Sequence, residues 1–227
     1  MKSGAGGAGR DLTVRVKTAR KRSTSSTKWL QRQLNDPYVA AAKREGYRSR
    51  AAYKLIEIDD QHHLLRRGAR VLDLGATPGG WTQVCVARAG AGRVLAVDIN
   101  EMDAVAGAEF MRLDFLSPEA PDLIRAALGG GVDIVLSDMA SPATGHRMTD
   151  HARIIALCNL ACEFACEVLS PGGSFCAKVL QGGTEAKLLA RMKQKFTRVQ
   201  HVKPNASRAG SKEIYVLATG FKGPSGL

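Results

Sequence analysis

Apolar residues are sparse in the first part of the chain and become regularly spaced only further along it. Residues 1–28 combine few apolar side chains with many Gly, Ser, Thr, Lys and Arg. We therefore predict a disordered basic tail over 1–28 and a domain over 29–227, with regular structure beginning near Trp29. Two helices are predicted next. One covers residues 37–45, between an Asp-Pro capping pair and a glycine, and the other covers about residues 49–60.

Beyond residue 70, short apolar runs alternate with longer amphipathic segments. The runs are predicted strands and cover residues 70–74, 94–97, 110–113, 132–136, 173–180, 198–202 and 214–218. Predicted helices between them cover residues 81–89, 121–128, 150–169 and 185–196. This alternation predicts an α/β fold with a doubly wound, mainly parallel seven-stranded sheet, preceded by the N-terminal helices. Such sheets bind ligands beyond the carboxyl ends of their strands.

The densest motif follows the first of these strands. Asp73 precedes a glycine-rich loop, Gly75-Ala76-Thr77-Pro78-Gly79-Gly80, which ends at Trp81 where a helix is predicted. Glycines let the backbone approach a ligand closely at a helix N-terminus. Two further acids, Asp98 and Asp114, follow the next two strands, at positions suited to a ribose and to an adenine amino group.

An NAD(P)-dependent oxidoreductase is the natural alternative for such a loop. The glycine spacing in this chain, however, is G-x-x-x-G-G, whereas dinucleotide-binding loops have G-x-G-x-x-G. Pro78 also lacks the backbone N–H that a pyrophosphate would use as a donor. Asp73 would repel a pyrophosphate but would attract a sulfonium or an amino group. S-adenosylmethionine carries both of these and no phosphate, so it is the cofactor that we expect.

Net charge supports an acidic body between two basic ends. Residues 1–54 carry 14 Lys and Arg against 3 Asp and Glu, a net charge of +11. Residues 55–177 carry 9 against 16, a net of −7, and residues 178–227 carry 10 against 2, a net of +8. Two separated basic blocks predict that a polyanion lies across the rim of the domain, with Lys and Arg on phosphates.

Other classes are disfavoured by what the sequence lacks. No apolar run approaches the roughly 18 residues of a membrane span, and no apolar segment follows the basic N-terminus as in a secretory signal. Cys158, Cys162 and Cys166 recur every fourth residue, which predicts reduced core thiols on one helix face. The five histidines show no metal-ligand spacing. We expect a cytoplasmic, metal-free monomer.

Four polar residues interrupt otherwise apolar runs: Lys54, Asp138, Lys178 and Glu213. A lysine within a parallel strand is unfavourable unless it is paired, so Lys178 stands out most. Each also has a purely structural interpretation. Lys54 could be a solvated helix residue, Asp138 a strand-end cap, Lys178 a lysine extended toward solvent, and Glu213 a charge that protects an edge strand.

These residues belong to a longer series of motifs. The series comprises Lys28-Trp29-Leu30, Tyr47-Arg48-Ser49-Arg50-Ala51-Ala52-Tyr53-Lys54-Leu55, Asp73-Leu74-Gly75, Pro78-Gly79-Gly80-Trp81, Ser137-Asp138-Met139-Ala140, Pro171-Gly172-Gly173-Ser174-Phe175 with Lys178, Ser207-Arg208-Ala209 and Ser211-Lys212-Glu213. From about Thr27 to Gly220 the sequence resembles the FtsJ-like family of ribosomal RNA 2′-O-methyltransferases, the large-subunit methyltransferase E group. Where that family often continues with Pro-Asn after Ser-Asp-Met-Ala, this chain has Ser141-Pro142, and its long basic N-terminal tail is also unusual.

The resemblance implies the Rossmann-like fold of class I methyltransferases and a uridine in the peptidyl-transferase-centre loop of assembled large subunits as substrate. The family's Lys-Asp-Lys-Glu tetrad falls on Lys54, Asp138, Lys178 and Glu213. Its cofactor contacts fall on Gly79, Trp81, Asp98, Asp114 and Asp138, beside Asp73 and Gly75 of the loop described above.

Hypotheses follow for the reaction, for RNA binding and for alternative functions. Lys178, held by Asp138 and Glu213, accepts the ribose proton or stabilises the developing alkoxide, with Lys54 as a second cation. We assign Arg48, Arg50, Arg208 and Lys212 to RNA phosphates. The alternatives are a 2′-O-methyltransferase of transfer RNA or of the messenger RNA cap, and a ribosome-assembly protein that binds RNA without turnover.

Overall fold

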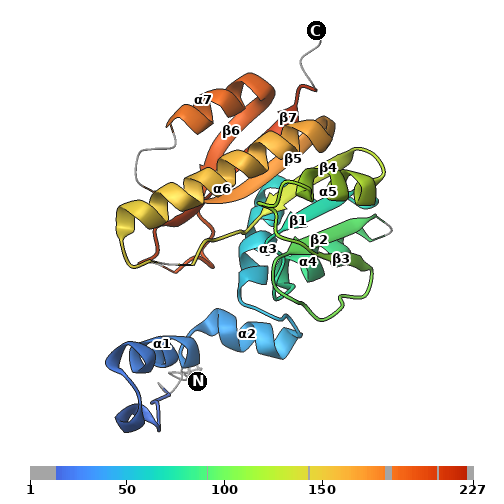
Figure 1. The fold of residues 1–227 in the computed structure, drawn as a ribbon. Coiled ribbons are helices and arrows are strands. Elements are labelled where there is room, and N and C mark those ends of the chain that lie inside the picture. The colour runs from blue at the N-terminus through green and yellow to red at the C-terminus, as the bar shows by residue number, and fades with distance from the viewer. Residues whose placement is uncertain (1–13, 91, 143, 182–185, 209, 224–227) are drawn as a thin grey trace, which may run out of the picture.

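Seven strands form one sheet in the order β3-β2-β1-β4-β5-β7-β6 (Figure 1). A computed structural model describes residues 14–90, 92–142, 144–181, 186–208 and 210–223. The strands are β1 Val71–Leu74, β2 Val94–Asp98, β3 Ala108–Arg112, β4 Val132–Ser137, β5 Leu169–Leu180, β6 Phe196–Val202 and β7 Glu213–Phe221. The first five run parallel, whereas β7 is antiparallel to both β5 and β6. The predicted doubly wound, mainly parallel sheet is confirmed.

Helices cover both faces of the sheet. On one face, α3 (Ala51–His62) and α4 (Gly80–Ala89) pack over a core that includes Leu55 and Trp81. On the other face lie α5 (Ala120–Leu128), α6 (Arg147–Val168) and α7 (Ala186–Lys195). Because both faces are covered, all residues of β1 and β2 are buried, which explains why these strands are apolar apart from Asp73 and Asp98.

Two helices precede this α/β unit and stand apart from its body (Figure 1). Helix α1 covers Thr24–Leu34, and α2 covers Pro37–Glu45 as the sequence predicts. The N-cap residue Asp36 accepts a hydrogen bond from the backbone N–H of Tyr38, and Gly46 ends α2 with a φ of 78°.

Some predicted boundaries are wrong. Regular structure begins before Trp29, because residues 19–21 form the 3₁₀ helix η1 and Ser23 caps α1 by accepting a hydrogen bond from the backbone N–H of Ser26. The predicted tail over 1–28 thus includes these helical turns, while residues 1–13 lie outside the described residues. Strand β5 begins at residue 169, four residues earlier than predicted, and its pairing with β4 shifts in register after the first pair, Val132 with Leu169.

The predicted thiol stripe is confirmed. Cys158 and Cys162 are buried on α6, Cys166 is half-buried there, and all three are free. Among the described helices, none is long and apolar enough to cross a membrane.

Candidate active site

Strand register brings the four predicted polar residues together. Parallel pairing of β4 with β5 sets Ser137 beside Ala177, so the next residues, Asp138 and Lys178, lie at the same level. Antiparallel pairing of β5 with β7 sets Leu180 beside Glu213, two residues beyond Lys178. Residues far apart in sequence therefore meet at one end of the sheet.

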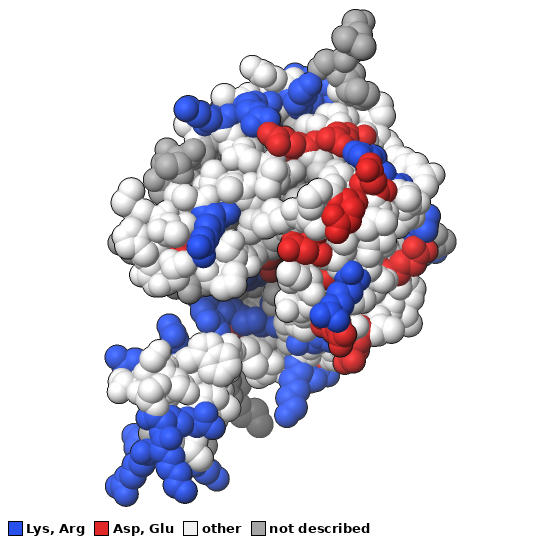
Figure 2. Space-filling model, in the orientation of Figure 1, with Lys and Arg blue, Asp and Glu red and all other residues white. Residues whose placement is uncertain are grey.

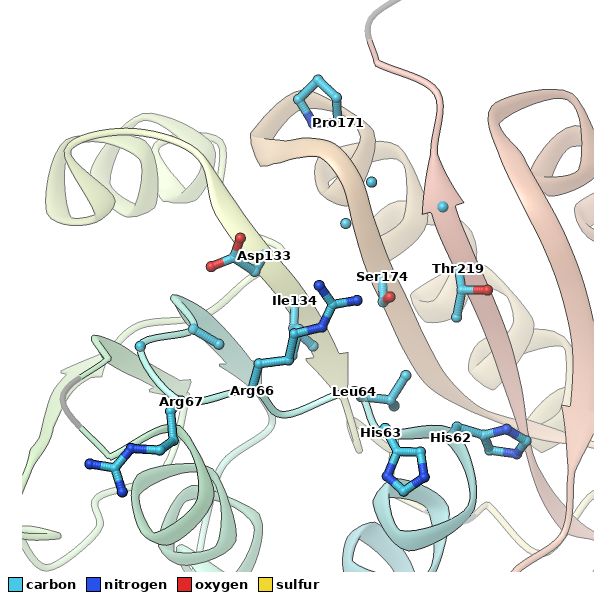
Figure 3. Close-up of a pocket in the computed structure, with 15 residues that line it drawn as sticks. His62, His63, Leu64, Arg66, Arg67, Asp133, Ile134, Pro171, Ser174 and Thr219 are labelled. Carbon is cyan, nitrogen blue, oxygen red and sulfur yellow. The ribbon is translucent and has the colours of Figure 1, made fainter.

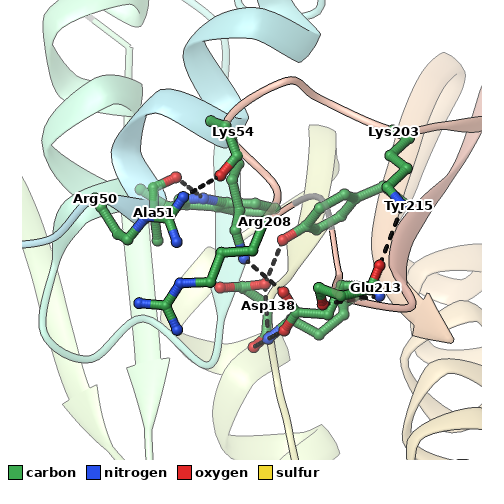
Figure 4. A network of polar contacts seen from close by, with 12 residues as sticks. Arg50, Ala51, Lys54, Asp138, Lys203, Arg208, Glu213 and Tyr215 are labelled. Atoms are coloured by element: carbon green, nitrogen blue, oxygen red, sulfur yellow. Dashed lines mark hydrogen bonds and ion pairs between the residues drawn. The ribbon is translucent and has the colours of Figure 1, made fainter. Parts of the chain in front are cut away.

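These side chains form a continuous chain of ion pairs (Figure 4). Lys178 Nζ lies 2.9 Å from Asp138 Oδ1, 2.9 Å from the Asp138 carbonyl oxygen and 3.9 Å from Glu213 Oε1. The other carboxylate oxygen of Glu213 lies 3.2 Å from Lys54 Nζ, which α3 contributes from across the site. Glu213 is therefore shared by two lysines.

Burial makes these pairings necessary. Lys54 and Lys178 are each only 8% exposed, and a buried ammonium is strongly unfavourable unless carboxylates and other acceptors surround it. The interpretation of Lys178 as a lysine extended toward solvent does not describe this geometry, because its Nζ lies inside the cluster.

A fifth residue, Tyr215, joins this cluster and was not singled out from the sequence. Its hydroxyl donates to Asp138 Oδ1 at 2.8 Å, and its ring lies 5.5 Å from that of Trp81 and 5.8 Å from Lys54 Nζ. Burial, together with the Asp138 and Glu213 carboxylates, holds the pKa of Tyr215 well above its usual value, so the hydroxyl stays a donor. The available signal was a tyrosine in an apolar strand, because a buried hydroxyl needs a partner.

Beside the cluster, a pocket of about 380 Å³ opens at the carboxyl ends of β1, β2 and β4. Three predicted acids line it: Asp98, Asp114 and Asp138. Asp138 thus belongs both to the pocket and to the ion-pair cluster. No Lys or Arg is found among the described residues that line the pocket, and of its three acids only Asp138 is paired with a lysine outside the lining, Lys178.

Asp98 organises the loops around this pocket. One carboxylate oxygen accepts a hydrogen bond from the backbone N–H of Thr77 at 2.9 Å, and the other accepts from the backbone N–H and side-chain amide of Asn100 at 2.8 and 3.1 Å. Asp114 is exposed at the rim, where its Oδ1 accepts a hydrogen bond from the backbone N–H of Leu116. Both acids keep further lone pairs that a ligand hydroxyl or amino group can use.

Gly75 forms part of the pocket floor and must be glycine. Its φ is +77°, and a Cβ placed there would lie 2.8 Å from both the backbone N and Cα of Met139. The two chain segments therefore approach each other more closely than any side chain allows.

Three residues predicted to contact the cofactor lie outside this lining. Asp73 is fully buried, and its Oδ2 accepts a hydrogen bond from the Thr82 hydroxyl at 2.7 Å, which ties β1 to α4. Burial raises the pKa of Asp73 to about 7 against the lowering effect of Thr82. Trp81 is buried with its indole N–H donating to the Ala51 carbonyl, and Gly79 faces Arg48.

Arg48 was predicted to bind RNA phosphate, but the structure places its guanidinium on the loops beside the pocket. It donates to the carbonyl oxygens of Pro78, Asp103 and Ala104 at 3.3, 2.6 and 2.7 Å. Arg48 therefore joins the glycine-rich loop to the segment that follows β2.

The other three predicted phosphate ligands lie near the ion-pair cluster. Arg50 is largely internal, with one guanidinium nitrogen 2.9 Å from Asp36 Oδ2 and another donating to the Ala206 carbonyl at 2.5 Å. Arg208 Nε lies 3.5 Å from the same Asp36 oxygen. Lys212 is exposed. Arg208 and Lys212 therefore retain accessible charge, whereas Arg50 holds α2 and α3 together.

A larger hollow of about 650 Å³ lies at the opposite end of the sheet (Figure 3). It is lined by His62, His63, Arg66 and Arg67 together with two strand residues, Asp133 near the beginning of β4 and Ser174 within β5. It contains none of the predicted site residues. Parallel sheets bind ligands at the other ends of their strands, so this hollow is not our candidate active site.

Comparisons with known proteins agree with this geometry. The sequence profile of the FtsJ-like methyltransferase family matches residues 47–221. The chain is 63% identical to ribosomal RNA large subunit methyltransferase E of Parvibaculum lavamentivorans, over 99% of this chain and 93% of that protein. Identity to the protein of the same name from Xanthobacter autotrophicus is 60%, over 95% and 86% of the two chains. A Plasmodium falciparum protein assigned as a ribosomal RNA methyltransferase superposes with a TM-score of 0.70 at 28% identity, over 78% of this chain and all of that one.

Proposed function

The chain belongs to the FtsJ-like methyltransferase family, and we propose that it transfers a methyl group from S-adenosylmethionine to a uridine ribose 2′-hydroxyl of large-subunit ribosomal RNA within the assembled subunit. The observation that carries this proposal is the shared position of Asp138. This residue lines the acidic pocket and also holds Lys178, so a bound cofactor and a target hydroxyl would meet beside it. The names of the two bacterial relatives support the choice of RNA.

The pocket residues fit S-adenosylmethionine. Three aspartates and no described basic residue line the space, and Asp98 and Asp114 form no ion pair with a described residue, which suits a positively charged ligand without phosphates and leaves a pyrophosphate uncompensated. We assign Asp98 to the ribose hydroxyls and Asp114 to the adenine amino group. When bound, the cofactor supplies a methyl group on a sulfonium, whose sulfur leaves as a neutral thioether.

We assign to Lys178 the hydrogen bond to the ribose 2′-oxygen. An ammonium has three N–H donors, and two of them are used by the Asp138 side chain and carbonyl at 2.9 Å. Glu213 at 3.9 Å is too distant for a hydrogen bond, so one donor remains for the substrate. Donation to the 2′-oxygen would stabilise the negative charge that develops there as the O–CH₃ bond forms, the S–CH₃ bond breaks and the hydroxyl proton passes to solvent water.

The remaining residues fix this donor in place. Lys54 holds Glu213, and Tyr215 together with Lys178 fixes Asp138. Correct positioning of reactants can contribute about 7–11 kcal/mol to the lowering of a barrier, whereas a general base contributes about 10²- to 10⁴-fold in rate. Positioning by this rigid cluster therefore dominates the proposed catalysis.

We further propose that the protein acts as a cytoplasmic monomer. All five cysteines are free, and four of them are buried, which is typical of proteins in a reducing compartment.

Tritium transfer from labelled S-adenosylmethionine tests the function. Large ribosomal subunits from cells that lack the gene, and total transfer RNA beside them, serve as acceptors. Label on one ribose 2′-oxygen of the large-subunit RNA is the expected result. Label on transfer RNA would show that transfer RNA is the substrate instead. Binding of cofactor without any methyl transfer would indicate a ribosome-assembly factor.

A further inference from the structure

Residues 14–34, here called the N-terminal arm, form a small unit built almost entirely from polar contacts. The backbone of Val14 and Val16 is held against α1 by side chains of that helix. Asn35, just after the helix, accepts from the Val14 N–H, Gln31 accepts from the Val16 N–H, and both amides donate to the Val14 carbonyl. No residue of α1 is buried. The arm thus has a defined shape without an apolar core of its own.

The arm carries positive charge only. Its basic residues are Arg15, Lys17, Arg20, Lys21, Arg22, Lys28 and Arg32, and residues 14–34 include no Asp or Glu. All seven side chains are exposed, and none forms an ion pair with another described residue. Figure 2 shows them as a dense cluster on the part of the molecule that stands away from the acidic body. Such a concentration of unpaired charge indicates a polyanionic partner.

Apolar side chains lie exposed among these cations. Trp29 is 50% exposed, and Leu34 and Val14 are exposed to a similar extent. A polyanion that is only a charged chain, such as an acidic peptide, does not require an aromatic ring. Unpaired RNA uses such a ring, because its bases stack on aromatic side chains while Lys and Arg neutralise its phosphates.

A groove lies between the arm and the loop that follows β6. It has a volume of about 570 Å³ and runs between the end of α1 and the loop after β6, with Arg32 and Asn35 on one side and Asn205 and Arg208 on the other. Arg50 also lines this groove, and it lies four residues before Lys54 of the ion-pair cluster, at the start of α3 (Figure 4). An RNA strand with one nucleotide at the cluster can therefore continue along this groove toward the arm.

We propose that the N-terminal arm is a docking surface for unpaired RNA, with its cations on phosphates and Trp29 stacked on a base outside the methylated nucleotide. The choice of ribosomal RNA as the natural partner rests on the proposed function. Binding of RNA by the arm does not depend on catalysis and is testable by itself.

Tryptophan fluorescence of the full chain gives a direct test. The chain has two tryptophans, Trp29 and the buried Trp81, so quenching by acrylamide reports mainly on Trp29. A mixed-sequence single-stranded RNA of about 20 nucleotides should protect Trp29 from the quencher. Polyaspartate of equal charge should not. Absence of protection by RNA, or equal protection by both polymers, would overturn the proposal, since the second result indicates attraction of any polyanion.

Matched variants separate direct binding from overall charge. Arg20→Ala/Lys21→Ala removes two charges from the arm, and Arg66→Ala/Arg67→Ala removes two from the opposite end of the sheet. We expect the arm variant to bind RNA about tenfold more weakly. Its binding should also depend less on salt, by about 0.7 in logarithmic slope for each phosphate that the variant no longer neutralises. The control variant should keep the wild-type slope. Equal slopes for both variants would refute direct binding of phosphates by the arm.

Trp29→Ala distinguishes failure of the arm from failure of the function. We expect its KM for large subunits to rise about tenfold, in line with the loss of one stacked base, while kcat and S-adenosylmethionine affinity stay unchanged. Unchanged KM in an active enzyme would show that the arm does not bind the substrate, and the proposed methyl transfer would still stand. If RNA protects Trp29 in a wild-type protein that methylates no subunit, the proposed methyl transfer is refuted and RNA binding by the arm still stands.

Discussion

The Tyr215 hydroxyl donates to Asp138 Oδ1 at 2.8 Å, and this is the same carboxylate oxygen that Lys178 Nζ contacts at 2.9 Å. Two donors on one oxygen fix the rotation of the carboxylate. Tyr215 itself is packed against Trp81, whose indole N–H is bonded to the start of α3. Tyr215 is therefore a positioning residue, which transmits the packing of the core to the ion-pair cluster.

Replacement of this hydroxyl should impair turnover more than binding. In Tyr215→Phe we expect kcat to fall about 10- to 100-fold because the Asp138–Lys178 pair loses its fixed orientation. KM for RNA and for S-adenosylmethionine should stay close to wild type. Urea unfolding should show a loss of about 1.5–3 kcal/mol, the usual range for a hydrogen bond to a charged group. Tyr53→Phe, which removes a hydroxyl bonded to surface Glu45, is the matched control. Equal kcat values in both variants would contradict the positioning role.

Loss of the central ammonium should abolish methyl transfer. For Lys178→Ala we expect kcat to fall at least about 10²- to 10³-fold, the effect of removing one preorganised donor to a developing oxyanion. Cofactor affinity, measured by calorimetry, should be retained because Lys178 does not line the pocket. Lys222→Ala, an exposed lysine beyond β7, should be fully active. An equal loss of cofactor affinity and turnover in Lys178→Ala would show that the residue supports the pocket instead.

Two glycines with nearly equal backbone angles separate conformational strain from steric exclusion. Gly75→Ala would place a Cβ 2.8 Å from the Met139 backbone at a φ of +77°, whereas Gly46→Ala has a φ of +78° and open space. Both substitutions should lower stability by about 1–3 kcal/mol through strain. Only Gly75→Ala should also weaken S-adenosylmethionine binding, by tenfold or more. Intact binding in that variant would place the cofactor elsewhere.

Arg48 should act on the cofactor rather than on RNA. Its guanidinium donates to three carbonyl oxygens beside the pocket, so Arg48→Ala should weaken S-adenosylmethionine binding and leave the salt dependence of RNA binding unchanged. Arg48→Lys cannot reproduce three donations and should be nearly as impaired. A reduced salt slope with normal cofactor affinity would restore the assignment to phosphate made from the sequence.

Asp73 should make stability fall as pH rises from about 4 to about 7. Its pKa is about 7 in the folded protein against a usual value of 3.8, so the folded state binds the extra proton between these values. Stability is therefore greatest below about pH 4 for this group and declines up to about pH 7, by at most roughly 4 kcal/mol. Asparagine cannot ionise, so the unfolding free energy of Asp73→Asn should rise relative to that of the wild type as pH increases over this range. Parallel curves for the two proteins would mean that Asp73 has an ordinary pKa.

The sheet and the convergence of its acids could be derived from local patterns. Apolar runs between amphipathic segments indicated all seven strands, and parallel strands end at one edge, so Asp98, Asp114 and Asp138 had to meet there. The unfavourable burial of a strand lysine likewise indicated that Lys178 needed acidic partners, which are Asp138 and Glu213. The resemblance to a known family added the tetrad as a set.

Side-chain directions could not be derived in this way. Every residue of β1 is buried, so the apolar pattern does not reveal that Asp73 faces α4 rather than the pocket. Arg48 looked like other exposed arginines, yet its acceptors lie 30, 55 and 56 residues further along the chain. The start of α1 depends on one serine hydrogen bond, which is a weak signal in the sequence because serine is common in loops.

By itself the sequence determined the strands, their common binding edge and the residue types gathered there, because these follow from local periodicity and from the geometry of parallel sheets. Only the tertiary structure decided which of those residues touch. The Tyr215–Asp138 and Lys54–Glu213 pairs span 77 and 159 residues. Pairings at such separations are set by strand register and helix packing, and a shift of one residue in either would turn each side chain to another face.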